Sequence, residues 1–141
     1  MKLYDCLRCG EVDISNFNCA EKILYCADRA YGLGLPPQAL KLAAGFGMGM
    51  GVCYTCGTVS AGVMVLSHLF VKEYAHEGNR IAKLTGELIR CVEKRLGTVD
   101  CAQLRRRYRT KEAGCNYIIY EVAKALDDIV GRELAEEGKA I

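Results

Sequence analysis

Apolar residues recur every three or four positions through most of the chain, a spacing typical of helices with one buried face. The stretch 79–96 is the clearest example, and its apolar residues fall on one face: Ile81, Leu84, Leu88, Val92 and Leu96. Gly97 follows directly and predicts the end of that helix. The strict alternation of apolar and polar residues that indicates half-buried strands is absent. The pattern therefore predicts an all-α protein.

Three more long helices and one short helix are expected from the same spacing. Pro36 and Pro37 suit the first turn of the short helix, which we expect to run to residue 43. The first of these long helices is predicted over 16–31. The second is predicted to begin at 56 or 57 and to end between 76 and 78, and the third begins at 114 or 115.

The remaining segments are polar or rich in glycine. The glycines of the stretch 45–51 predict a loop rather than a helix. Residues 1–15 form a polar N-terminal segment, and residues 133–141 form a polar tail that we expect to fray. No linker divides the chain, so we predict a single antiparallel helix-bundle domain over 1–141 with four main helices.

Length and charge exclude several classes of function. A chain of 141 residues supports one domain with its own core, and 51% hydrophobic with 26% charged residues is an ordinary globular balance. The formal charge of +2 is too small to indicate binding to nucleic acid or to an anionic membrane. No apolar run is long enough to cross a bilayer, and residues 1–11 lack the apolar core of a secretory signal. We therefore expect a cytoplasmic protein.

The nine cysteines are the unusual feature of the composition. The cytosol does not sustain structural disulfides, so cysteines there point first to metal binding or redox chemistry. An odd number also excludes complete pairing within one chain. Function is therefore to be sought in the positions of these thiols.

Three cysteines head the apolar faces of predicted helices. Cys19, Cys56 and Cys115 each begin such a face, and Cys101 lies just beyond the end of the helix 79–96. In an antiparallel bundle with short connections, these four positions meet at the same end. A helix N-terminus favours a thiolate over a thiol, and the thiolate is the form that binds metal. The sequence therefore predicts a shared centre with these four cysteines as metal ligands.

Two Cys-x-x-Cys pairs add further candidates. Cys6 with Cys9 and Cys53 with Cys56 have the two-residue gap that lets two sulfurs reach one ion or form one disulfide. They either extend the same centre or form a second one. Cys26 and Cys91 lie inside predicted helices on apolar faces, and we interpret both as core residues.

Backbone amides near the thiols could also contact a cofactor. Gly49 and Gly51 belong to the glycine-rich loop, and Gly57 follows Cys56; all three are candidates to place backbone close to the sulfur centre. No strand precedes the loop, so it is not a dinucleotide-binding motif.

Three functions are compatible with these residues. Four thiolates without a nearby histidine favour an iron–sulfur cluster for electron transfer or as an accessory to an oxidoreductase. The alternatives are a metal-free thiol–disulfide redox protein and a structural or storage zinc module. No catalytic base, nucleophile–histidine pair or paired carboxylates were found. An electron carrier or accessory protein is thus favoured over a stand-alone enzyme, and a homodimer that shares the centre stays open.

Several segments resemble the C-GCAxxG-C-C family of redox-active proteins. The resemblance spans 16–129 and includes the segments 17–20, 35–51, 56–64 and 95–101 and the helix that begins at Cys115. It maps the four signature cysteines to Cys19, Cys56, Cys101 and Cys115. The family is similar in length and is associated with oxidoreductases, which implies an oxidoreductase partner such as a molybdopterin enzyme. Thr58 and Ala61 depart from the family pattern, in which Ala and Gly are usual.

Overall fold

The computed structural model describes residues 1–141, which form helices without strands. The all-α prediction is confirmed. The α-helices, in chain order, are α1 (Leu3–Cys9), α2 (Cys19–Tyr31), α3 (Pro37–Leu40), α4 (Gly57–Phe70), α5 (Arg80–Leu96), α6 (Cys101–Tyr108) and α7 (Asn116–Glu136). Shorter helical turns cover η1 (Lys41–Phe46), η2 (Gly49–Cys53) and η3 (Ala75–Glu77). No helix combines the length and the apolar character needed to cross a bilayer.

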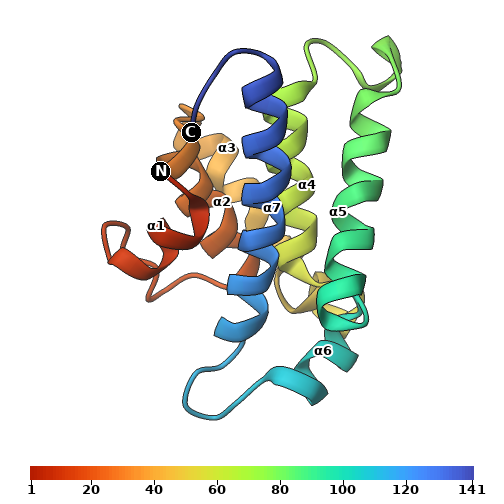
Figure 1. The fold of residues 1–141 in the computed structure, drawn as a ribbon. Helices are drawn as coiled ribbons and strands as arrows, with labels where there is room; N and C mark the ends of the chain where they lie inside the picture. Colours follow the sequence, from red (N-terminus) through yellow and green to blue (C-terminus); the bar gives the residue numbers. More distant parts are fainter.

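The long helices α4, α5 and α7 lie side by side, with α2 packed against α4 and α1 against both α2 and α7 (Figure 1). Successive helices α4 and α5 run in opposite directions, while α4 and α7 both begin at the lower end in Figure 1, where α6 also lies. The starts of α4 and α7 therefore lie at the same end of the molecule as α6.

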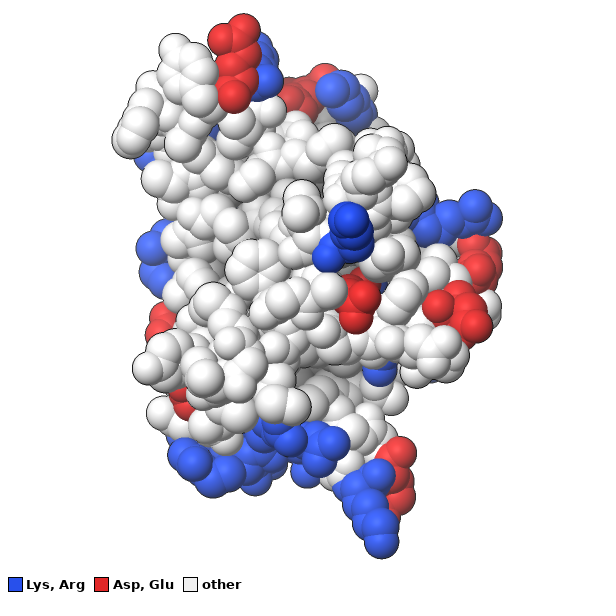
Figure 2. All heavy atoms as spheres, turned by 180° about the vertical axis from the view of Figure 1, so that it is seen from behind, with Lys and Arg blue, Asp and Glu red and all other residues white.

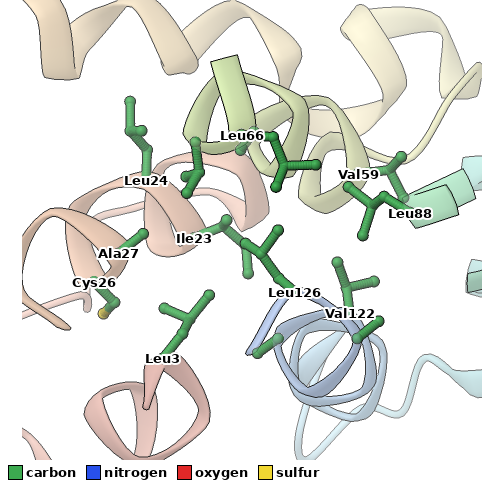
Figure 3. Packing of buried hydrophobic residues seen from close by; sticks show 14 of the residues in the cluster. Leu3, Ile23, Leu24, Cys26, Ala27, Val59, Leu66, Leu88, Val122 and Leu126 are labelled. Atoms are coloured by element: carbon green, nitrogen blue, oxygen red, sulfur yellow. The ribbon is translucent and has the colours of Figure 1, made fainter. Parts of the chain in front are cut away.

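Aliphatic side chains from five helices fill the space between them (Figure 3). Ile23 of α2, Leu66 of α4 and Leu126 of α7 are each no more than 1% exposed. They point toward one another across the centre of the molecule, with Leu3 of α1 below them in the view. Burial of each such side chain stabilises the fold by about 1.5–3 kcal/mol before the entropy cost is counted. This continuous core holds the helix starts in fixed positions.

Capping fixes where α2 begins. The Asn18 side chain accepts the backbone N–H of Glu21, and the Glu21 carboxylate accepts the N–H of Asn18. This reciprocal pair satisfies two amides that would otherwise lack partners. The helix therefore starts at Cys19, three residues later than the sequence prediction of 16.

Two helices, α1 and α6, were missed in the sequence, and α4 was predicted too long. The Asp100 carboxylate accepts the N–H of Gln103 and begins α6, in a segment for which no helix was predicted. Helix α4 ends at Phe70 rather than at 76–78. The reason is Glu77, whose carboxylate accepts three backbone N–H groups from residues 72–74 and holds a separate turn.

The predicted fraying of 133–141 is wrong for its first residues. Helix α7 continues to Glu136, and Leu134 is buried against the core. Glu133 is also buried, and its carboxylate pairs with Arg80 at 3.2 Å and Arg132 at 3.1 Å. The polar pattern of this segment gave no indication that Leu134 packs against the core or that Glu133 pairs with Arg80.

Candidate functional site

Four cysteines line one small cavity at the end of the molecule where the helices begin. The cavity measures about 20 Å³, close to the space that one water occupies. Its lining consists of Cys19, Cys56, Thr58, Cys101, Leu104, Arg105, Cys115 and Ile118. The four cysteines named from the sequence as ligands are thus brought together from four separate segments.

Each of these cysteines stands at the start of a helix. Cys19 and Cys101 are the first residues of α2 and α6, and Cys56 and Cys115 directly precede α4 and α7. The sequence had predicted three helix starts here, and α6 supplies a fourth. A helix N-terminus carries unpaired N–H groups and a partial positive charge. The cavity therefore lies where four such ends favour negative charge.

A short antiparallel contact brings Cys56 and Cys101 together. The N–H of Cys56 donates to Val99 O at 2.8 Å, and the N–H of Cys101 donates to Tyr54 O at 2.6 Å. The two cysteines are 45 residues apart in the chain, yet the backbone bonds beside them fix their relative position. This pairing was not predicted, because neither segment has the pattern of a strand.

Cys56 is the most closely surrounded of the four thiols. Its sulfur lies 2.9 Å from the hydroxyl of Thr58, and the residue is 5% exposed. Burial raises the pKa of the Cys56 thiol, while the Thr58 hydroxyl and the backbone amides of Thr58 and Val59 act to lower it. Thr58 therefore supplies a hydrogen bond at the position where the family resemblance leads one to expect alanine.

Cys19 packs against the backbone of α4. A Cβ on Gly57 would lie 2.8 Å from the Cys19 sulfur and 2.7 Å from the carbonyl oxygen of Phe46. Burial raises the pKa of the Cys19 thiol, and the backbone amides of Met48 and of the first residues of α2 lower it in part. Glycine at position 57 is thus required for the sulfur to approach this closely.

Cys101 lies beside Cys53, at the edge of the cavity. Burial raises the pKa of Cys101 to about 11, with contributions from Cys56 and Cys53, while Arg105 lowers it. A Cβ on Gly49 would lie 2.8 Å from the Cys101 Cβ and 2.4 Å from the backbone nitrogen of Tyr54. Gly49 also has φ +55°, which glycine adopts without strain. Cys53 therefore adjoins the four-cysteine pocket without lining it.

Gly51 and the pair Cys6 and Cys9 lie away from the pocket. A Cβ on Gly51 would meet nothing within 4 Å, so this glycine serves the loop conformation through its φ of +79°. Cys6 and Cys9 belong to α1 and are absent from the pocket lining. They neighbour Cys26 of α2 instead. Of the three additional cysteines predicted from the Cys-x-x-Cys pairs, only Cys53 adjoins the pocket.

Arg105 is a site residue that the sequence analysis left unassigned. It follows Cys101 by four positions in α6, so both side chains lie on the same face of that helix. Asp100 as a helix cap was the available signal, because a helix that starts there places residues 101, 104 and 105 together. No helix was predicted over 101–108, so this relation was not recognised in the sequence.

The donor atoms of the pocket suit a thiolate-binding metal, but the space is small. Four sulfurs with no histidine or carboxylate in the lining are the donor set of zinc, iron and iron–sulfur sites. A volume of about 20 Å³ accommodates one ion, whereas a cluster of several irons requires the cysteine side chains to turn outward. As they stand, no three His, Cys, Asp or Glu side chains are gathered closely enough to hold a metal ion.

The fold and the pocket together define an all-α, cysteine-rich protein with a four-thiol site at converging helix starts. The sequence model of the family described as "Putative redox-active protein (C_GCAxxG_C_C)" matches residues 17–129. The chain belongs to this family, and the resemblance seen in the sequence is confirmed. Neither the curated proteins nor the solved structures contain a match to it.

Proposed function

We propose that Cys19, Cys56, Cys101 and Cys115 form a redox centre that binds thiolate-ligated iron, as an iron–sulfur group, and passes electrons to a partner oxidoreductase. The observation that carries this proposal is the convergence of four helix starts on four cysteines around one cavity. Membership of a redox-active family supports the general role. The thiols need a reducing environment to remain available, and we accordingly propose a cytoplasmic location.

The residues around the sulfurs have distinct roles in this proposal. A bound iron centre supplies the one-electron chemistry that cysteine side chains lack. The Thr58 hydroxyl lies 2.9 Å from the Cys56 sulfur and would donate a hydrogen bond to it once the sulfur is a metal-bound thiolate. Hydrogen bonds to ligand sulfurs influence reduction potential. Leu104 and Ile118 are both buried and cover the cavity with apolar surface, which limits access of water.

A second candidate is metal-free dithiol–disulfide chemistry within the same pocket. It is favoured by the small volume of the cavity and by the lack of three metal-ligating side chains close enough together to hold an ion. All four pocket cysteines are free in the structure, and Cys19 has Cys56 and Cys115 as neighbours. Two of these thiols would give up two electrons and two protons to an oxidising disulfide and become joined by an S–S bond.

Purification without oxygen separates the candidates. Iron and acid-labile sulfide in the isolated protein, with visible absorption that disappears on chelation, are expected for the first. If the protein contains no metal, and two pocket cysteines form a disulfide that a small dithiol reduces, the second candidate replaces the first. Stoichiometric zinc without iron would contradict both and indicate a structural metal module.

Charge around the pocket supports an acidic partner. Arg106 and Arg109 are exposed near the end of α6, and neither takes part in an ion pair. Figure 2 shows Lys and Arg gathered at the end of the molecule where α6 lies, beneath a broad surface with few charges. Large apolar side chains are exposed in the neighbouring loop, including Val52 at 62% and Tyr54 at 67%. We propose that an acidic oxidoreductase docks here and receives electrons through the pocket.

An anionic redox mediator tests this surface without a known partner. Replacing Arg106 and Arg109 together by Glu should slow oxidation of the reduced protein by ferricyanide several-fold at low salt, because electrostatic steering is reversed. The difference should shrink at 0.5 M salt. Lys72→Glu together with Lys83→Glu, two exposed lysines near the start of α5 at the opposite end of the molecule, is the matched control. Equal rates for both variants at low salt would contradict the proposed docking surface.

A further inference from the structure

A second group of thiols lies between α1 and α2, outside the four-cysteine pocket. Cys6 and Cys9 belong to α1, and Cys26 lies in the middle of α2. Cys6 is 1% exposed and Cys26 is 0% exposed, whereas Cys9 is an exposed residue. The family match begins at residue 17, so it does not include α1 or its two cysteines.

The three thiols form a path from the surface to the core. The Cys9 thiol donates to the carbonyl oxygen of Cys6 at 3.3 Å, which places Cys9 over the turn that carries Cys6. The Cys6 and Cys26 thiols lie next to each other where α1 packs on α2, and Cys6 therefore has a sulfur neighbour on each side. In Figure 3 the Cys26 sulfur is turned toward the side of α2 on which α1 lies.

The surroundings of Cys6 and Cys26 keep these two buried thiols protonated at neutral pH. Burial, followed by the neighbouring Cys6 and Cys9, raises the pKa of Cys26 to about 12. Burial is also the largest cause of the raised pKa of Cys6. Unlike the pocket cysteines, neither residue stands at a helix start, so no helix N-terminus compensates for the burial. Direct thiol–disulfide exchange at Cys6 or Cys26 is consequently slow, and oxidation has to begin at an exposed cysteine.

We propose that Cys9, Cys6 and Cys26 form a separate redox-sensitive site that accepts oxidation at Cys9 and ends in a disulfide between Cys6 and Cys26. The product joins α1 covalently to α2. The site responds to an oxidising small disulfide, such as oxidised glutathione, and does not depend on any metal in the pocket.

The chemistry is a sequence of thiol–disulfide exchanges. Deprotonated Cys9 attacks one sulfur of the small disulfide, forms a mixed disulfide and releases one small thiolate, which takes up the proton lost by Cys9. Cys6 then attacks the Cys9 sulfur, and the second small thiol leaves with the Cys6 proton. Finally Cys26 attacks Cys6 and returns its proton to Cys9. In total, two cysteine thiols are oxidised and one small disulfide is reduced to two thiols.

The helix end permits the intermediate Cys6–Cys9 bond. Residues three apart in a helix have Cβ atoms about 5–6 Å apart, which is longer than the roughly 3.5–4.5 Å of a disulfide. Cys9 is the last residue of α1, and Gly10 follows with φ +78°. Cys9 can therefore approach Cys6 by unwinding the end of the helix without disturbing the packed face that contains Leu3 and Leu7.

Peptide mapping after treatment with oxidised glutathione tests the proposal. Trypsin cuts after Arg8, Lys22 and Arg29, so Cys6, Cys9 and Cys26 fall in three different peptides. The expected product joins peptide 3–8 to peptide 23–29 and leaves Cys9 free to react with an alkylating reagent. Persistent glutathione on Cys9 with both other cysteines reduced would overturn the proposal.

Two variants and a control separate the steps. Cys9→Ser should slow formation of the joined peptides by at least about tenfold, because the exposed acceptor is lost. Cys26→Ser should stop the exchange at a disulfide between Cys6 and Cys9. Cys91→Ser should leave the rate unchanged, since Cys91 lies on α5 outside the group. If Cys9→Ser cross-links at the wild-type rate, the proposed order of steps is wrong.

Discussion

The pocket and the α1–α2 group contain the same side chain in opposite positions along helices. Cys19 and Cys56 stand at helix starts, where backbone amides oppose the effect of burial on their pKa values. Cys6 lies in the middle of α1, Cys9 is its last residue, and Cys26 lies within α2, so none of them stands at a helix start with such amides. Burial raises the pKa of thiols in both groups, and only at the helix starts of the pocket do backbone amides offset part of that rise. The comparison teaches that the place of a cysteine in its helix decides whether backbone N–H groups are available to stabilise a thiolate.

The largest expected effect is on the pocket ligands. Cys56→Ser and Cys115→Ser should each remove the iron centre completely, because each takes away one sulfur that belongs to a separate helix start. Iron and sulfide analysis of protein prepared without oxygen measures the loss. Cys26→Ala is the matched control in the other group and should retain full metal content. Equal loss in the control would remove the distinction between the two groups.

Releasing α1 tests whether the two regions are independent. The Asp127 carboxylate of α7 accepts the N–H groups of Leu3 at 2.7 Å and Tyr4 at 3.0 Å and the hydroxyl of Tyr31 at 2.6 Å. Asp127→Ala leaves these three buried or part-buried donors without their acceptor, and we expect a loss of about 3 kcal/mol in the free energy of unfolding. Urea denaturation measures it.

The same Asp127→Ala variant should keep its iron. If metal content falls with stability under conditions where the protein is folded, α1 and the pocket are coupled, and the comparison between two independent regions fails.

Gly57 tests the close approach of α2 to α4. Gly57→Ala places a Cβ within 2.8 Å of both the Phe46 carbonyl oxygen and the Cys19 sulfur, and a shift of backbone is needed to relieve it. We expect a loss of about 2 kcal/mol, together with reduced metal retention. Gly45→Ala is the control, since a Cβ there meets nothing within 4 Å, and its effect should remain within about 0.5 kcal/mol. A loss for Gly57→Ala as small as that of the control would show that the pocket tolerates the added methyl group.

The smallest effect concerns pH dependence in the α1–α2 group. The pKa of Cys26 is raised from 9.0 to about 12, so the folded protein retains this proton where the unfolded chain loses it. The resulting stability is complete below pH 9 and is lost as the pH rises toward 12. Cys26→Ala should therefore flatten the alkaline decline in denaturation midpoint of the reduced protein. An unchanged slope would show that Cys26 ionises without penalty.

Helical periodicity predicted much of the fold because it reports which side chains are buried. The helix 79–96 was placed within one residue, since its apolar face and Gly97 lie in adjacent sequence. Helix α6 was missed because its start depends on the Asp100 cap, and its surface is dominated by arginine. The length of α7 depends on Glu133 contacts with Arg80, 53 residues away. Such long-range pairs leave no periodic signal.

The pocket was predictable in part for the same reason. Cys19, Cys56 and Cys115 head apolar faces, so their convergence followed from the direction of the helices. Gly57 was named as a close approach, and its contact with Cys19 has that geometry. The partnership of Cys6 with Cys26 was not predicted. It depends on α1 packing across α2, and a polar segment of fifteen residues gave no indication of that helix.

The most direct measurement is X-ray absorption at the iron edge on protein prepared without oxygen. The account predicts iron surrounded by sulfur alone in the wild type, and the same spectrum when Cys6, Cys9 and Cys26 are all replaced by Ala. It also predicts no bound iron when Cys19, Cys56, Cys101 and Cys115 are all replaced by Ser. Sulfur-ligated iron that survives in the second variant and disappears in the first would contradict it.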